Sequence, residues 1–299
     1  MRLGNVRENG YLLVSKEDLQ PDSQVALITG CSSGIGLLAA VELARAGFRV
    51  VATMRDPGRC ERLDAEAARE GVGGRIDVRR LDVTDFPALP GLVDSLLRDY
   101  GRLDAVVNNA GFAMAGFAED LSVEEVKRQL ETNFFGHVAL TRAVLPAMRR
   151  QASGHIIMVS SISGRAGQPG VSAYSASKFA LEGWTETLRL ETRALGIKVV
   201  LIEPGAFDTE IWERNVQLGA VTTSGQSPNS ARGQKLREWS RKTRKRDARV
   251  VARLIARVAR HPNPRLRYLV GADAKLHFAL RAILPWKWYE RMVTRLVGI

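Results

Sequence analysis

Apolar positions along the chain follow two alternating patterns. Short runs rich in β-branched and aliphatic residues, typical of buried strands, are separated by longer stretches in which apolar positions recur with helical spacing. Strands and helices that alternate in this way predict an α/β fold built on a doubly wound parallel sheet of the Rossmann type. The runs are Val25–Thr29, Arg49–Thr53, Ile76–Leu81, Ala105–Val107, Ile156–Val159, Val199–Ile202 and Arg267–Val270.

The stretches between these runs predict the helices that flank the sheet. Ser122 and Glu125 are spaced as a capping box, so a long helix should open after Ser122 and run to about Arg150. Ala248–His261 shows a basic amphipathic pattern, and Ala272–Val297 is a second amphipathic helical region broken at Pro285. The other helical patterns cover Leu37–Ala46, Arg59–Glu70 and the stretch from about Ala173 to Leu195.

The chain divides into one folded domain and a polar leading stretch. Residues 1–22 are expected to form a flexible N-terminal extension, followed by a single domain over residues 23–299. Within that domain residues 206–246 show little regular pattern, and their length suits either a substrate lid or a disordered insert. Residues 272–299 form a C-terminal amphipathic extension.

The composition is typical of a soluble globular protein. With 299 residues, 45% of them hydrophobic and 25% charged, the chain can bury a sizeable core. Its two cysteines, Cys31 and Cys60, give no disulfide framework and suit a reducing cytoplasm. No apolar run approaches the length of a transmembrane helix, and no His and Cys residues cluster with metal-ligand spacing. We therefore expect a cytoplasmic protein without a metal ion.

The net charge of +12 is concentrated towards the C-terminus. Residues 231–299 hold 19 Lys or Arg against 4 Asp or Glu, whereas the first 230 residues hold 25 against 28. This asymmetry suits either a solvated basic surface or contact with something anionic. The most basic segment, residues 232–260, lacks the interleaved aromatic residues of a nucleic-acid stacking platform, Trp239 excepted, which argues against nucleic acid as a partner.

A glycine-rich turn lies between the first strand and the first helix. Gly30, Gly34 and Gly36 follow one another there in the spacing Gly-x-x-x-Gly-x-Gly. Glycines at such a turn let the backbone approach a pyrophosphate, and the helix N-terminus faces its negative charge. The pattern predicts dinucleotide binding, although any tight turn can use glycine.

The ends of the next two strands bear on the choice of cofactor. Enzymes that select NAD usually end the second strand with an acid that binds the ribose hydroxyls, but Met54 and then Arg55 stand there. An arginine can pair with the 2′-phosphate of NADP, unless a one-residue shift brings Asp56 into reach instead. Asp82, after the third strand, suits either the adenine amino group or the cap of the next helix.

Candidate catalytic residues surround the fifth strand. Tyr174 and Lys178 are four residues apart, so on a helix they share one face. An ammonium beside a phenol favours the phenolate and lowers its pKa from about 10 towards the working range. Ser161 follows the strand, where its hydroxyl could bind the same substrate oxygen. Asn133, inside the long helix, is either a surface residue or a further member of this group.

Taken together, the motifs resemble those of the short-chain dehydrogenase/reductase family over roughly residues 23–270. The matching residues, in the family's order, are Thr29-Gly30-x-x-x-Gly34-x-Gly36, Asn108-Asn109-Ala110-Gly111, Asn133, Ser161, Tyr174-x-x-x-Lys178 and Pro204-Gly205. Within the family the chain is most similar to the branch of 17β-hydroxysteroid and retinol dehydrogenases. The segments that carry this second likeness are Thr29–Gly36, Ala52–Asp56, Ala176–Gly183 and Pro264–Tyr268.

The resemblance implies a role for each matched residue. Tyr174 would give a proton in reduction and take one in oxidation, while Lys178 would lower the pKa of Tyr174 and bind the nicotinamide ribose. Ser161 would position the substrate oxygen, and Asn133 would order a water that relays protons to Lys178. Phe207 stands where the family more often has Val or Ile. The residues implied in cofactor binding are Gly30, Ser33, Gly34, Ile35, Gly36, Arg55, Asp82, Val83, Asn109, Ala110, Gly111, Tyr174, Lys178, Pro204, Gly205, Phe207 and Thr209.

These implications predict an NADP(H)-dependent oxidoreductase, with NADPH preferred over NADH. It would move a hydride between the nicotinamide and an alcohol or carbonyl of a largely apolar substrate such as a steroid, retinoid or lipid. A 3-oxoacyl reductase is the alternative enzyme, because its acidic carrier protein or coenzyme would suit the basic C-terminal region. A non-catalytic nucleotide sensor or nucleic-acid-binding protein is the alternative of another class, but it has no need of a matched proton relay.

Two further partners are suggested by apolar surfaces. Helices 123–150 and 173–195 carry apolar residues beyond one core-facing stripe and pair across a two-fold axis in similar proteins, so we expect a homodimer. The basic segment 232–260 and the Trp-bearing segment Phe278–Val297 together suit a protein that lies on an anionic membrane surface. Alternatively, the Trp-bearing segment packs over the substrate pocket and the arginines are simply solvated.

Overall fold

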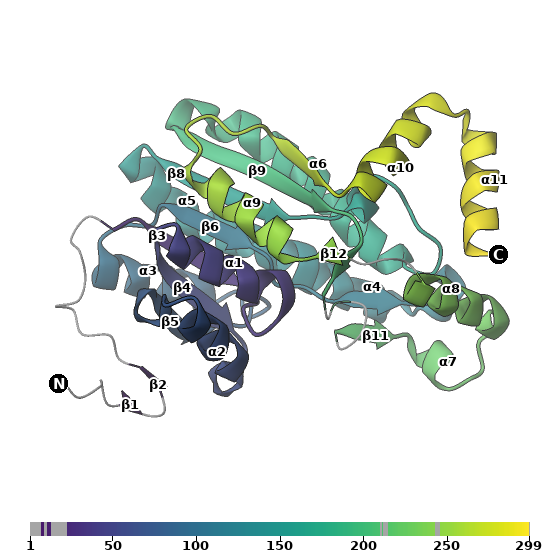
Figure 1. Ribbon diagram of the computed structural model, residues 1–299, viewed down its shortest axis with the longest axis horizontal. Helices are drawn as coiled ribbons and strands as arrows, with labels where there is room; N and C mark the ends of the chain where they lie inside the picture. The colour runs from purple at the N-terminus through teal and green to yellow at the C-terminus, as the bar shows by residue number, and fades with distance from the viewer. Residues whose placement is uncertain are drawn as a thin grey trace.

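The computed structural model describes residues 7–8, 11–12, 23–209, 211, 215–242 and 246–298. The extension predicted over residues 1–22 lies outside the described residues, except for two short antiparallel strands, β1 (Arg7–Glu8) and β2 (Tyr11–Leu12). From residue 23 onwards the structure centres on a seven-stranded sheet with helices on both faces (Figure 1).

Every neighbouring pair of strands in the central sheet is parallel, as the alternating pattern predicted. The spatial order is β13-β9-β8-β6-β3-β4-β5, so the order reverses between β3 and β6. In open sheets of this kind, ligands bind outside the carboxyl ends of the strands at that reversal. The strands are β3 (Val25–Thr29), β4 (Arg49–Met54), β5 (Ile76–Arg80), β6 (Ala105–Asn108), β8 (Gly154–Val159), β9 (Ile197–Pro204) and β13 (Arg267–Val270).

Two apolar clusters sandwich the sheet. One lies under the helices α1 (Gly34–Arg45), α2 (Glu61–Arg69) and α9 (Arg249–Arg260). The other lies under α3 (Ala88–Tyr100), α5 (Gly136–Gln151) and α6 (Ser172–Thr192). Because both faces are covered, β3, β4, β6 and β8 are buried along their whole length, which explains why their sequences read as continuous apolar runs.

The long helix expected after Ser122 is interrupted once. Its capping box is confirmed, since Ser122 Oγ accepts a hydrogen bond from Glu125 N (3.1 Å) and Glu125 Oε2 accepts one from Ser122 N (2.8 Å). However, α4 (Val123–Leu130) passes into a π-helical turn at Glu131–Phe135 before α5 begins. The turn places Asn133 where it is fully buried, so the interpretation of Asn133 as a surface residue is wrong. Such turns often occur at functional sites.

Residues 206–246, which show little regular pattern in the sequence, form several short elements. Their described part contains β10 (Phe207–Asp208), β11 (Val216–Leu218), α7 (Ala220–Thr223), α8 (Ser230–Lys242) and β12 (Arg246–Asp247). β11 pairs with β7 (Ala113–Ala115), and β10 pairs with β12. Polar contacts hold α8 in place, because Ser227 and Asn229 donate to Asp120 (2.8 Å) and Glu119 (2.7 Å). These tertiary contacts leave no periodic signal in the sequence.

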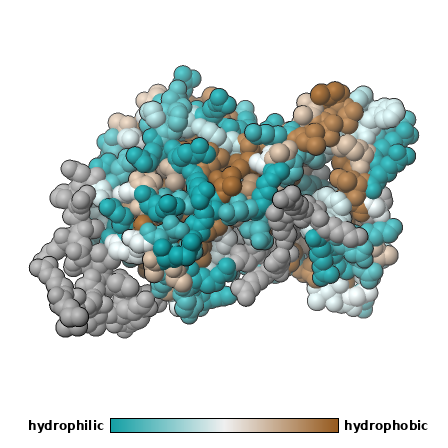
Figure 2. Space-filling view, in the orientation of Figure 1, coloured by the Kyte–Doolittle hydropathy of each residue, from teal (hydrophilic) through white to brown (hydrophobic). Residues whose placement is uncertain are grey.

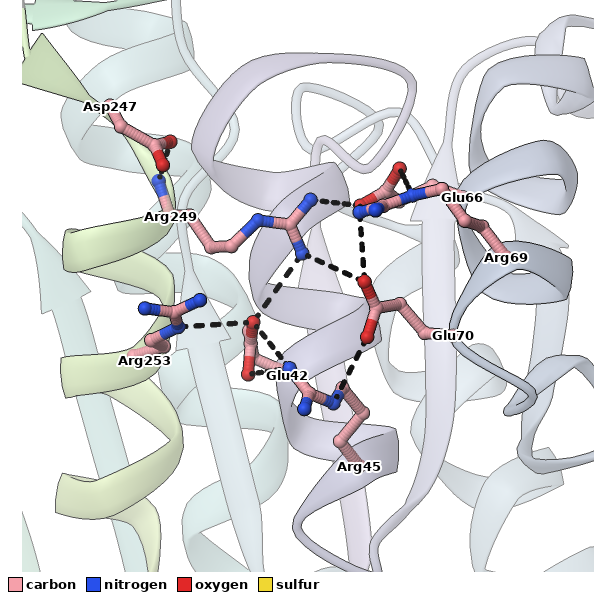
Figure 3. A network of polar contacts seen from close by, with 8 residues as sticks. All are labelled: Glu42, Arg45, Glu66, Arg69, Glu70, Asp247, Arg249 and Arg253. Atoms are coloured by element: carbon pink, nitrogen blue, oxygen red, sulfur yellow. Dashed lines mark hydrogen bonds and ion pairs between the residues drawn. The ribbon is translucent and has the colours of Figure 1, made fainter.

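The basic helix α9 packs against the body of the protein. Its apolar face is buried, and its first arginine, Arg249, contacts Glu42 of α1, Glu66 of α2 and Glu70, which follows α2 (Figure 3). Arg253 Nε lies 3.6 Å from the same Glu42 carboxylate. Part of the positive charge of residues 232–260 is therefore balanced inside the molecule.

The C-terminal extension forms α10 (Ala272–Ile283) and α11 (Trp286–Val297), separated at Pro285 as the pattern predicted. The two helices form an arm that leaves the end of β13, turns back and reaches α8 (Figure 1). Across the described ranges, every helix is too short or too polar to cross a membrane.

Candidate active site

The glycine turn lies at the carboxyl end of β3, beside the reversal in strand order. Gly30 and Gly34 have φ angles of +75° and +57°, a region that favours glycine. A Cβ added to Gly36 would collide with the carbonyl of Gly30 and the side-chain amide of Asn109. The first turn of α1 holds no acidic residue, and the Ser33 side chain does not cap the helix. This backbone-lined turn at a helix N-terminus has the shape and polarity that suit a pyrophosphate.

Thr29 and Asn109 fasten the glycine turn to the end of β6. Asn109 Nδ2 donates to the carbonyls of Thr29 (2.8 Å) and Gly30 (3.3 Å). In return, Thr29 Oγ1 accepts hydrogen bonds from the backbone N–H groups of Asn109 (3.0 Å) and Ala110 (2.9 Å). The Asn109 side chain therefore holds the turn in its conformation, and Gly111, two residues on, packs against Asn133.

The residues after β4 and β5 bear on two of the alternatives left open by the sequence. Arg55 is exposed directly after β4, whereas Asp56 Oδ1 accepts a hydrogen bond from Gly58 N (3.0 Å) and caps the turn that follows. Asp82 Oδ1 accepts hydrogen bonds from Thr84 N (3.0 Å) and Thr84 Oγ1 (2.8 Å). Because α3 begins only at Ala88, the alternative that Asp82 caps the next helix is wrong. Val83, beside it, is buried and packs against Gly136.

Ser161, Tyr174 and Lys178 meet at the carboxyl end of β8. Tyr174 and Lys178 lie one turn apart on α6, and each is only 4% exposed. Lys178 Nζ lies 5.8 Å from the centre of the Tyr174 ring and donates to the carbonyl of Val159 (2.8 Å), the last residue of β8. The Ser161 hydroxyl forms a hydrogen bond with Tyr174 and also accepts one from Ser163 N (3.1 Å). The sequence motif is thus assembled into one contiguous group.

Asn133 lies against the helix that carries this group. Its Oδ1 accepts from Phe112 N (3.1 Å), while its Nδ2 donates to Phe112 O (3.0 Å) and lies 3.4 Å from the hydroxyl of Ser177. Gln129, one turn earlier, accepts a short hydrogen bond from Met114 N (2.6 Å). The two amides together fix residues 112–114, which form one wall of the site.

Burial dominates the protonation of the central pair. Burial raises the pKa of Tyr174 to about 12, and the hydrogen bond from Ser161 opposes this only in part. Burial also lowers the pKa of Lys178 to about 8, with the carboxylate of Glu182 acting in the opposite direction. Burial therefore sets the direction of the shift in the pKa of Tyr174 here, because a phenolate taken out of water is costly. That Lys178 lowers the pKa of Tyr174 in the working enzyme stays a prediction.

The remaining walls of the site are apolar and come partly from the segment 206–246. Tyr174 packs with Ala113, Val171 and Ile211. A Cβ on Gly170 would lie 2.8 Å from Leu236, so α8 reaches the loop that precedes Tyr174.

The end of β9 and the turn that follows it close the carboxyl edge of the sheet and contain four of the predicted cofactor residues. Pro204 is the last residue of β9, and Gly205 N donates to Val270 O (2.9 Å). Phe207 is buried, and Thr209 is partly exposed. The adjoining Ala206 N donates to Asp273 of α10 (2.8 Å), so the C-terminal arm helps to hold this turn.

Comparison with known proteins agrees with this geometry. The family model described as short chain dehydrogenase matches residues 24–218. The chain belongs to the short-chain dehydrogenase family. Members of this family are oxidoreductases, and relatives of this chain carry that description.

Relatives in the family cover most of this chain. It is 39% identical to the oxidoreductase YusZ of Bacillus subtilis over 92% of this chain and 98% of that protein. It is 36% identical to 3-ketodihydrosphingosine reductase of Bacteroides thetaiotaomicron, over 87% and 92% respectively. Human retinol dehydrogenase 8 is 43% identical over a shorter stretch, 62% of this chain and 60% of that protein, in line with the branch suggested by the motifs.

Solved structures give the same assignment. A short-chain dehydrogenase from Streptomyces avermitilis has a TM-score of 0.74 at 31% identity, covering 90% of this chain and 98% of that one. A metagenomic short-chain oxidoreductase in complex with NADP has a TM-score of 0.65 at 26% identity, covering 84% and 97%.

Two features of this short-chain dehydrogenase were missed by sequence reasoning. His137 is fully buried beside the site; burial lowers its pKa to about 3, so the ring is neutral, and its Nε2 lies 2.8 Å from Ala110 O. Behind Lys178, Glu182 and Glu203 share Arg267 at 3.0 and 3.3 Å. No sequence motif predicts the buried position of a single histidine. The four-residue spacing of Tyr174, Lys178 and Glu182, by contrast, places Glu182 on the helix face of the catalytic pair and could have predicted its position.

Proposed function

We propose that this short-chain dehydrogenase is an NADP(H)-dependent oxidoreductase that interconverts an alcohol and a carbonyl on a largely apolar substrate. The observation that carries the proposal is the contact between Ser161 and Tyr174 beside Lys178, at the edge of the sheet that also bears the glycine turn. Two adjacent hydroxyls, one of them a buried proton donor, are what a carbonyl oxygen needs in order to be held and protonated.

The chemistry divides between the cofactor and the chain. Bound NADPH would supply a hydride to the carbonyl carbon. Tyr174 donates its phenolic proton to the carbonyl oxygen, which Ser161 holds with a second hydrogen bond. The raised pKa of Tyr174 keeps the phenol protonated at neutral pH, as a donor requires. Lys178, with a pKa of about 8, is mostly charged there and stabilises the phenolate left behind. In oxidation the same burial opposes loss of the phenol proton.

The cofactor assignment rests on the shape and charge of the carboxyl edge. The glycine turn and the N-terminus of α1 suit the pyrophosphate, and Arg55 lies exposed at the end of β4, where a 2′-phosphate would be bound. Asp56, the competing residue, already caps its own turn. The metagenomic relative in complex with NADP supports the same choice.

Replacing Arg55 with alanine is expected to weaken NADPH binding about 10- to 100-fold and to leave NADH binding nearly unchanged, because only NADPH presents the phosphate that the guanidinium pairs with. Titration of both cofactors by calorimetry measures the two dissociation constants. Arg150→Ala, which removes an exposed arginine at the end of α5, is the matched control. Equal losses for the two cofactors would show that Arg55 is not the selector.

The affinity for NADPH is expected to fall roughly five- to tenfold as the pH rises through about 8, because Lys178 then loses the proton that makes its bond to the ribose charge-assisted. Tyr174 and His137, with pKa values of about 12 and about 3, do not titrate in this range. Calorimetric titrations between about pH 6.5 and about 9.5 test this. Arg55→Ala should bind more weakly but keep the same pH dependence, whereas a flat profile would contradict the role of Lys178.

The apolar walls around Tyr174 support an apolar substrate. Two relatives are named for long apolar substrates, retinol and 3-ketodihydrosphingosine. Consumption of NADPH should be assayed with retinoid, steroid and long-chain ketones in parallel with 3-oxoacyl thioesters. Turnover of the thioesters alone would replace this proposal by the 3-oxoacyl reductase alternative.

We also propose a homodimer formed through α4, α5 and α6, whose outer surfaces expose large apolar side chains, among them Phe179 and Leu190. These two residues lie on one face of α6, and Leu190 is 73% exposed. Light scattering at micromolar concentration should give twice the chain mass of 32.9 kDa. Leu190→Asp should shift the mass towards the monomer, whereas a monomeric mass for the unaltered protein would contradict the dimer.

A further inference from the structure

The helix α10 exposes an apolar stripe on the side that faces away from the protein. Ala272, Leu276, Ala279 and Ile283 are spaced four, three and four residues apart, so they share one face, and all four are exposed. Leu276 is 62% and Ile283 79% exposed. The opposite face attaches α10 to the body, since Ala274 is fully buried and the Arg165 guanidinium stacks 4.5 Å from the ring of a second α10 residue, Phe278.

The helix α11 is attached in the same one-sided way. Tyr289 and Val297 are buried, and Tyr289 Oη lies 3.0 Å from His277 of α10. Trp286 and Trp288, each 63% exposed, and Leu296, 62% exposed, remain uncovered. The alternative that the Trp-bearing segment packs over the substrate pocket leaves both tryptophans in contact with solvent. Figure 2 shows apolar residues along α10 and along the side of α11 that faces the body, whereas the outer side of α11 is hydrophilic.

Basic side chains flank this apolar surface. Along α10 and α11 the exposed cations Lys275, Lys287, Arg291 and Arg295 outnumber the exposed anions Asp273 and Glu290. The helix α8, which contacts α11, contributes further exposed basic residues: Lys235, Arg237 and Arg241. Unlike Arg249 and Arg253 of α9, which meet carboxylates of α1 and α2, these residues lie on the side of the molecule that carries the arm (Figure 1).

We propose that the arm α10–α11 binds the surface of an anionic phospholipid bilayer, with both helices lying in the headgroup region. An exposed apolar stripe such as that of α10, together with exposed Trp, Lys and Arg side chains such as those of α11, is typical of helices that lie in a membrane interface. On α11 Trp288 shares a face with Arg291 and Arg295, and anionic headgroups complement these cations. Each helix has 12 residues and is therefore about 18 Å long, too short to cross the hydrocarbon core. Charge disfavours a second copy of the arm as the occupant, because two basic surfaces would repel each other.

Sedimentation with vesicles tests the proposal on the full-length protein. Vesicles of phosphatidylcholine mixed with phosphatidylglycerol should carry the protein into the pellet at low salt, and binding should weaken as salt screens the charges. Vesicles of phosphatidylcholine alone should bind at least tenfold less. The double variant Trp286→Ser/Trp288→Ser and the triple variant Lys287→Glu/Arg291→Glu/Arg295→Glu should each lower partitioning to the anionic vesicles at least tenfold.

Two controls separate the arm from general surface effects. Val250→Ser removes an exposed apolar residue of α9, and Arg149→Glu/Arg150→Glu reverses two exposed cations of α5; both should sediment like the unaltered protein. The proposal is overturned if the unaltered protein stays in the supernatant with anionic vesicles at low salt, or if the tryptophan variant sediments unchanged. Binding to neutral and anionic vesicles alike, insensitive to salt, would also overturn it. If the unaltered protein does not bind vesicles and the tryptophan variant no longer forms a dimer, the arm instead contacts a second copy of the protein.

Discussion

Replacing Tyr174 with phenylalanine is expected to lower kcat by about 10²- to 10⁴-fold, while the fold and the affinity for NADPH stay close to those of the unaltered enzyme. The substitution removes one hydroxyl from a side chain that is only 4% exposed, and the ring that packs against Ala113 and Val171 remains. What is lost is the proton donor to the substrate oxygen, which Ser161 can still hold but whose developing charge it cannot neutralise.

Two measurements distinguish this chemical effect from a structural one. Stopped assays of NADPH consumption give kcat, and calorimetric titration gives the dissociation constant of NADPH for the same preparation. Tyr289→Phe is the matched control. Tyr289 is also only 4% exposed and its hydroxyl also has a partner, His277, but it lies on the arm. A Tyr174→Phe enzyme that keeps near-normal kcat would remove Tyr174 from the mechanism, whatever happens to the control.

The sheet could be predicted because strands buried on both faces appear in the sequence as continuous apolar runs. Strands such as β3 and β8 are covered by helices on each side, so every position is apolar and the run is visible without any structural knowledge. The glycine turn and the Tyr174–Lys178 pair are likewise local, since each depends on spacing within a single turn or helix. Parallel topology then brings these local motifs to one edge of the sheet.

The environment of the site could not be predicted because it depends on contacts between distant segments. Asn133 reaches the site through a π-helical turn, and periodicity does not distinguish that turn from the α-helix around it. The high pKa of Tyr174 is a consequence of burial, which a Tyr-x-x-x-Lys motif does not encode. The start of α8 is held by hydrogen bonds from Ser227 and Asn229 to acids more than a hundred residues earlier.

Replacing Gly36 with alanine is expected to destabilise the protein by about 1–3 kcal/mol and to weaken NADPH binding at least tenfold. The added Cβ would meet the carbonyl of Gly30 and the side-chain amide of Asn109. The amide could rotate away, but it would then give up its bonds to Thr29 O and Gly30 O. The carbonyl belongs to a glycine turn that is fixed at both ends. The steric clash can therefore be removed only if α1 moves away from β3, which would distort the glycine turn proposed to bind the pyrophosphate.

Gly183→Ala provides the matched control, because it makes the same chemical change in the same kind of element. Gly183 lies inside α6, and no atom lies within 4 Å of an added Cβ. Alanine there should stabilise the helix by about 0.5–1 kcal/mol, since glycine loses more conformational freedom on folding. Denaturant unfolding of the two variants should therefore give shifts of opposite sign, and only Gly36→Ala should lose NADPH affinity. If Gly36→Ala unfolds at the same denaturant concentration as the unaltered protein, the turn can accommodate an added Cβ. Steric exclusion would then not explain the glycine at this position.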